Sequence, residues 1–334
     1  MGRLTASERT VVKVLDRNYQ QILATSGKDG ASMAWLTSRL LLFPYSIGIA
    51  IATFDRLSEI THAATRTVSI LREDFAIKDA AINCMYQIHG TTCFTEVLNM
   101  LSRYPESTPL QMAGLRFLVI LLRPMHGENL STSRLGLRSL INDSQAAKEV
   151  LMIATHHKEN SSVIALLLKV CTNLEQYGRQ RNYLMANGIF ALIATAMRDH
   201  LEHSAVQVAG FSAYRNFLHN DFSHCDSDPR EILQTVIEIC IDTSSRHYIY
   251  EHHEKGQGYL VDSLIMNLLQ HLTLYSHHKL STKNERLKQL LEMVYNRYSE
   301  IPLDPSESAI TTTLLAIDVM KRVMEEEEQD GFCH

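Results

Sequence analysis

One stretch of this chain is similar to another stretch 96 residues later, and the two align without a gap. "LQMAGLRFL" aligns with "VQVAGFSAY", which pairs Gln111 with Gln207 and Gly114 with Gly210. Further identical pairs are Phe94 and Phe190, Glu106 and Glu202, and Ala113 and Ala209. A chain that repeats itself at a fixed interval is typical of proteins built from stacked copies of one small unit.

One weaker copy of the same pattern lies between the two stretches and begins at Val150, and another follows the second stretch and begins near Val236. The copies from Val150 onward start about 43 residues apart. The spacing between the first copy and the copy at Val150 is longer, because the polar stretch "RPMHGENLSTSRLG" is inserted between them. A spacing of about 43 residues lies in the range of two-helix and three-helix repeats.

The hydrophobic pattern predicts helices throughout. Apolar residues recur every three or four positions, and no stretch alternates convincingly between apolar and polar residues. Glycine (14) and proline (7) are scarce among the 334 residues. Ser or Asp precedes several apolar stripes, as in "SESAITTTLL" and "DPREILQTVIEI", which is typical of helix starts. We therefore expect about fifteen helices joined by short turns, and essentially no strand.

The matched glycines suggest how these helices pack. A glycine inside an exposed helix destabilises it by about 1 kcal/mol relative to alanine. The recurrence of Ala113-Gly114 as Ala209-Gly210 therefore indicates close approach of neighbouring helices. A single helix hairpin cannot bury its apolar face alone, whereas stacked hairpins form a continuous core. The sequence predicts an all-α fold, in which stacked hairpins form an α-solenoid.

We expect three parts along the chain. Residues 1–58 form N-terminal helices that cap the array, residues 59–324 form the repeat array, and residues 325–334 form an acidic, disordered and solvated tail containing Glu325–Glu328. The first part contains an apolar segment, residues 33–54. We interpret this segment as buried opening helices, because Arg39 and Pro44 interrupt it. The alternatives are a membrane-associated segment, with Trp35 and Tyr45 at the interface, or a docking patch.

Composition limits the classes of function. The net charge of −5 gives no overall basic field, so nucleic acid is not an expected partner. The six cysteines include no C-x-x-C pair, and several lie in apolar runs such as "KVCTNL", which is typical of buried thiols in a reducing compartment. No leader peptide is evident. We expect a cytoplasmic protein, membrane-associated only if residues 33–54 meet lipid.

The sequence gives no pattern for catalysis or metal binding. Sixteen histidines occur, but the adjacent pairs do not have the spacing of two ligands on one helix face. The loop "HNDFSHCDSD" matches no zinc or calcium pattern. A nucleophile elbow and a phosphate-binding loop are both missing. We therefore predict no catalytic residue, no metal and no cofactor, and keep an uncharacterised helical enzyme as an alternative.

Residues 184–218 resemble an armadillo repeat. Members of that family have a short first helix, a glycine before the second helix, a polar turn and a long third helix that ends in Asn-Leu. Gly188 and Asn216-Phe217 stand at the matching places here. Residues 92–122 and 147–175 resemble the family more weakly. The resemblance implies a right-handed α-solenoid of armadillo-like repeats.

The resemblance also implies a non-catalytic scaffold that binds a protein or peptide on a concave face lined by the third helices. Asparagines on those helices would hydrogen-bond the bound partner. The matching residues are Asn173, Asn216 and Asn267, with Arg215 and Tyr214 as neighbours. The other interpretation is that these asparagines cap or bridge helices.

Two departures from the family pattern bear on the kind of partner. Ile120 interrupts the series of asparagines, and the tryptophans that often flank them are missing, since Trp35 is the only tryptophan. We therefore expect a protein surface or an amphipathic helix as the partner, rather than an extended basic peptide.

Overall fold

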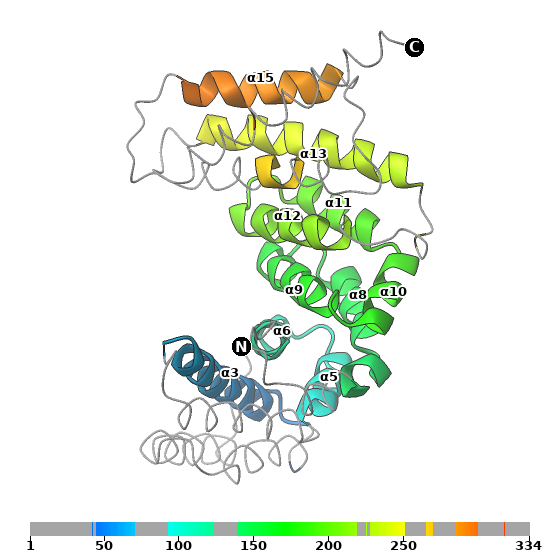
Figure 1. Cartoon of the computed structure of the whole chain (residues 1–334). Helices are drawn as coiled ribbons and strands as arrows, with labels where there is room; N and C mark the ends of the chain where they lie inside the picture. Colours follow the sequence, from blue (N-terminus) through cyan, green and yellow to red (C-terminus); the bar gives the residue numbers. More distant parts are fainter. Residues whose placement is uncertain are drawn as a thin grey trace. The chain divides into compact units, whose positions relative to one another are not determined.

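The computed structural model describes residues 42, 45–70, 93–122, 139–218, 225, 228–250, 265–269, 285–299 and 317. Within these residues every regular element is a helix and no strand occurs (Figure 1). The predicted all-α class is therefore confirmed. The acidic segment Glu325–Glu328 and Trp35 lie outside the described residues.

Internal contacts divide the chain into two compact units. The first unit contains the residues up to Lys158 together with Gln176–Gln180. The second contains Glu159–Glu175 and the residues from Arg181 onward. This division lies inside the stretch that the sequence predicts as one array.

In the first unit, four long helices and the short helical segment 139–143, which contains the buried Ile141, build the described core. The long helices are α3 (Ile47–Ile70), α5 (Cys93–Arg103), α6 (Thr108–Leu121) and α8 (Ala146–His156). Helix α6 packs against α3 and α5, and α8 packs against α5. Proline occupies the first turn of α6, where its missing N–H has no partner to lose.

The second half of the predicted apolar segment opens α3. Ile49, Ala50 and Phe54 are buried, in agreement with the prediction of a buried helix for this half of the segment. Tyr45, just before α3, is 81% exposed, and the guanidinium of Arg103 lies 5.3 Å from the centroid of its ring. Among the described helices, none combines the length and the apolar character that crossing a bilayer requires.

The second unit contains α9 (Ser161–Leu174), α11 (Ile189–Asp199), α12 (Ser204–Leu218), α13 (Pro229–Tyr250) and α15 (Glu285–Ser299). Helix α10 (Gly178–Ala186) begins in the first unit and continues into the second. Helix α12 packs against α9 and α11, and α13 packs against α11 and α15. An ion pair of 3.3 Å between Arg198 and Glu238 also joins α11 to α13.

The three helices predicted within residues 184–218 are present as the end of α10, α11 and α12. Gly188 precedes α11 with φ of 79°, in the left-handed region that glycine adopts most readily. The side chain of Asn160 accepts a hydrogen bond of 3.2 Å from the backbone N–H of Val163, which caps the N-terminus of α9.

The two matched glycines lie in equivalent surroundings. A Cβ atom added to Gly114 would lie 2.5 Å from Cδ2 of Leu101, across the contact of α6 with α5. A Cβ atom added to Gly210 would overlap Sδ of Met197, across the contact of α12 with α11. Met197 follows Leu101 by the same 96 residues as Gly210 follows Gly114. The expectation that these glycines permit close packing is confirmed.

Three buried glutamines bind carbonyl groups at the C-terminal ends of helical segments. The side-chain N–H groups of Gln111 donate to the carbonyls of Leu101 (2.8 Å) and Tyr104 (3.0 Å). Those of Gln207 donate to Met197 (2.9 Å) and His200 (2.9 Å). Each glutamine supplies partners that the last carbonyls of a helix otherwise lack. The two sets of contacts are again 96 residues apart.

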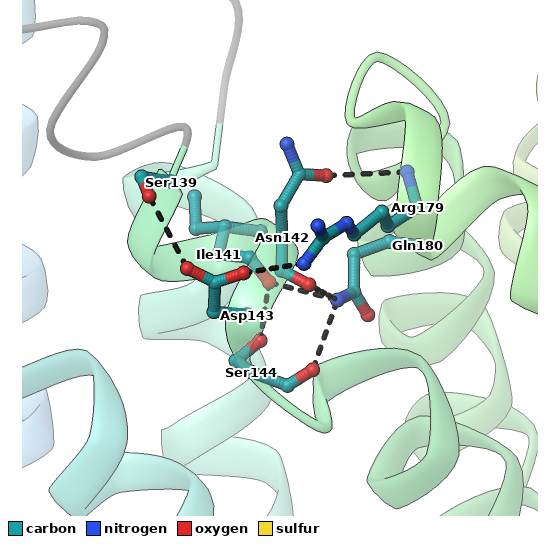
Figure 2. A network of polar contacts seen from close by, with 7 residues as sticks. All are labelled: Ser139, Ile141, Asn142, Asp143, Ser144, Arg179 and Gln180. Carbon is teal, nitrogen blue, oxygen red and sulfur yellow. Dashed lines mark hydrogen bonds and ion pairs between the residues drawn. The ribbon is translucent and has the colours of Figure 1, made fainter.

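The third glutamine, Gln180, binds the backbone of residues 141–147 in the first unit, and Figure 2 shows its contacts with Ile141, Asn142 and Ser144. Its amide N–H groups donate to the carbonyls of Ile141 (2.7 Å) and Ser144 (3.0 Å), and its oxygen accepts from the backbone N–H of Ala147 (2.9 Å). An exposed ion pair of 2.6 Å between Arg179 and Asp143 lies beside it. Gln180 is only 4% exposed. Its buried hydrogen bonds therefore stabilise this part of the fold more than the solvated ion pair does.

Candidate partner-binding face

Two of the three predicted asparagines lie on helices that pack against each other. Asn173 is in the last turn of α9 and Asn216 is in the last turn of α12, and Figure 1 shows these helices side by side. Both side chains are half-buried, and both take part in interactions within the chain. Asn267 lies in the short helical segment 265–269, and its side chain is also half-buried and engaged.

Side chains at three matched places, 43 residues apart, line the accessible side of the two helices. We call them the α9–α12 face, and its residues are Lys169, Thr172, Asn173, Ser212, Arg215 and Asn216. Lys169 and Arg215 are exposed, and the other four side chains are half-buried. The face therefore combines two cationic groups with amides and hydroxyls.

The hydroxyl groups of the α9–α12 face are held by their own helices. Thr172 Oγ1 donates to the carbonyl of Leu168 (2.8 Å), and Ser212 Oγ donates to the carbonyl of Val208 (2.8 Å). With their protons engaged, both oxygens retain lone pairs that accept hydrogen bonds. Each helix thus presents an acceptor hydroxyl near an amide.

The charge on this face has one sign. Helices α9 and α12 contain no aspartate or glutamate, and Lys169 and Arg215 are their only charged side chains. Neither of these cations forms an ion pair with a described residue. Glu175, which follows α9, lies 3.9 Å from Arg181 and is compensated by it. The α9–α12 face is therefore locally cationic within a chain of net charge −5.

The predicted contact residue Tyr214 does not belong to this face. Its side chain is 1% exposed, and its ring stacks on that of Phe190, with centroids 6.3 Å apart. Its hydroxyl donates to the carbonyl of Phe190 (3.3 Å). Burial raises the pKa of Tyr214. The ring belongs to the core beneath the face, so its assignment as a partner contact was wrong.

Cys171 also lies in the core below the face. It is fully buried, and desolvation raises the pKa of its thiol to about 12. A thiol with this pKa is protonated at neutral pH and is a poor nucleophile. Among the described residues, no group of three or more His, Cys, Asp or Glu side chains could hold a metal ion.

Two kinds of residue escaped the sequence prediction. The first is Lys169, which stands 43 residues before Ser212 at the matching place of the preceding repeat. Because the two residue types differ, only this spacing could have indicated that Lys169 belongs to the face. The buried glutamines Gln111 and Gln207 are identical across the longer interval, but their partners are backbone carbonyls, which leave no trace in the sequence. Ile120, which interrupts the series of asparagines, is half-buried on α6.

Comparison of the chain with protein-family models, curated proteins and solved structures gives no match. The armadillo resemblance therefore remains a prediction that rests on the sequence pattern.

Proposed function

We propose that the protein is a non-catalytic scaffold of armadillo-like helical repeats, which binds a partner protein or peptide on the α9–α12 face. The observation that carries the proposal is the matched placement of Asn173 and Asn216 on two helices in contact. A side-chain amide offers both a donor and an acceptor, as a peptide group does. Matched amides on adjacent helices can therefore hydrogen-bond successive parts of one partner.

The spacing of the helices supports this interpretation. Packed helices lie about 8–10 Å apart, and an extended chain advances about 3.3 Å per residue. A partner segment crossing α9 and α12 would thus meet an amide about every third residue. The exposed positions on both helices are small or polar, except for the two cations, and the half-buried positions include the aliphatic side chains of Leu166 and Val208. None of these side chains is aromatic, so a bound segment meets no large ring.

A peptide-display selection on the purified full-length chain tests the proposal. Peptides selected by the wild type should lose affinity in the variant Asn173→Ala/Asn216→Ala/Asn267→Ala. They should keep it in Asn182→Ala, a matched change of a half-buried asparagine on α10. Because the three asparagines also have partners within the chain, circular dichroism and thermal unfolding must show that the triple variant is folded.

A second variant keeps the test decisive if the triple variant unfolds. Arg215 is exposed, so Arg215→Trp adds a bulky ring to the face at little cost to the core. Blocked binding in this folded variant supports the proposal. A selection that yields no peptide, or peptides that bind every variant equally, contradicts it.

A further inference from the structure

From the charges on the α9–α12 face, we infer that its partner is an acidic peptide segment, in which carboxylates of Glu or Asp contact Lys169 and Arg215. This inference rests on the proposed function and specifies the chemistry of the partner. It replaces the broader expectation of any protein surface or amphipathic helix.

The two cations lie at neighbouring rows of the face. Lys169 shares its row with Ser212, and Arg215 shares its row with Thr172. An acidic side chain at either row would meet one positive charge, and it would meet no carboxylate of α9 or α12. The attraction comes from the cations alone, because the hydroxyls of Thr172 and Ser212 already donate their protons to their own helices.

The same arrangement disfavours a basic partner. A basic segment would bring like charges against Lys169 and Arg215, and neither helix offers a compensating carboxylate. Like-charge contacts suppress wrong partners, whereas complementary charges speed association with the right one. An apolar segment would cover the two cations without giving them a partner of opposite charge. The charge complementarity of the face thus points to one class of partner.

A titration with defined peptides tests the inference. The probes are fluorescein-labelled peptides of about ten residues, long enough to cross both helices, with Glu, Gln or Lys at alternate positions. Fluorescence anisotropy with the full-length chain gives the Kd of each. We expect the Glu peptide to bind most tightly at low ionic strength. Its binding should weaken as salt shortens the screening length.

The charge-reversal variant is Lys169→Glu/Arg215→Glu. We expect the Kd of the Glu peptide to rise at least about tenfold, because two attractions become two repulsions. The matched control is Lys148→Glu/Arg246→Glu, which changes the net charge equally at exposed positions on α8 and α13. The Kd of the Glu peptide for this control variant should change by less than about threefold, because neither substituted residue belongs to the α9–α12 face.

Each outcome decides between the two proposals. Equal weakening in both variants would show a general field effect and overturn the inference, as would failure of the Glu peptide to bind. If the Gln or Lys peptide binds and Arg215→Trp blocks it, the scaffold function stands and only the acidic partner is refuted. If no peptide from either experiment depends on the face, the proposed function fails as well.

Discussion

Replacing Gln207 by leucine should destabilise the protein more than the same change at Gln111. Both glutamines are fully buried and donate to two helix-end carbonyls, so both changes remove the same pair of hydrogen bonds. They differ at the amide oxygen. The oxygen of Gln207 accepts from the hydroxyl of Thr243 (3.1 Å), whereas the buried oxygen of Gln111 has no hydrogen-bond partner among the described residues.

The magnitude follows from counting unsatisfied groups. A buried polar group without a partner costs about 1–3 kcal/mol. Gln207→Leu creates one more such group, since the hydroxyl of Thr243 is fully buried. Gln111→Leu instead removes one such group, the amide oxygen of Gln111. The loss in unfolding free energy should therefore be larger for Gln207→Leu by about 2 kcal/mol or more.

Hydrogen exchange followed by mass spectrometry measures the two sites separately, because peptides from α5–α6 and α11–α12 report their own opening free energies. Thr243→Val provides the control. In wild type it should cost about 1 kcal/mol or more, and in the Gln207→Leu background it should cost little, since its partner has already gone. Equal losses at Gln111 and Gln207, or additive effects of Gln207 and Thr243, would refute the assignment of these hydrogen bonds.

Three further predictions concern helix packing, pH and thiol chemistry. Gly114→Ala and Gly210→Ala should each lower the thermal midpoint, because overpacking costs about 1–3 kcal/mol and exceeds the gain in helix propensity of about 1 kcal/mol; unchanged or raised midpoints would contradict this. Partial desolvation raises the pKa of Asp55 above 3.8 although Arg116 lowers it, so the folded state binds its proton more tightly than the unfolded state. Stability from this group should be greatest at pH values below 3.8 and decline as the pH rises through the raised pKa. Asp55→Asn should abolish that pH-dependent part, as measured by thermal unfolding from pH 3 to 7; an identical pH profile would contradict it. The thiol of Cys171, with a pKa of about 12, should react with a disulfide reagent only after unfolding, and rapid labelling of the native protein would contradict its burial.

The helical class and the packing role of two glycines were predictable from the sequence. Apolar spacing specifies helices directly, and an Ala-Gly pair repeated at a fixed interval had few explanations besides close approach. The contacts of Gly114 and Gly210 agree with that reasoning. The arrangement of the repeats as a solenoid was a further step, and it remains part of the proposal.

The facing of individual side chains was harder to predict. Tyr214 and Arg215 are neighbours in α12, yet the tyrosine is buried and the arginine is exposed. A rotation of about 100° per residue separates them, and an error of one position in the helix phase exchanges their roles. Partners such as Gln207 and Thr243 are equally hidden, because they come from different helices and meet only in the fold.

Site-specific photo-crosslinking can locate a bound partner on the α9–α12 face. Benzoylphenylalanine in place of Thr172 would sit on the face, while the same probe in place of Thr155 on α8 serves as a control, since both hydroxyls donate to a carbonyl four residues earlier. With a peptide from the display selection, we expect crosslinking from position 172 and none from position 155. Crosslinking from 155 alone, or equally from both positions, would contradict binding at the α9–α12 face.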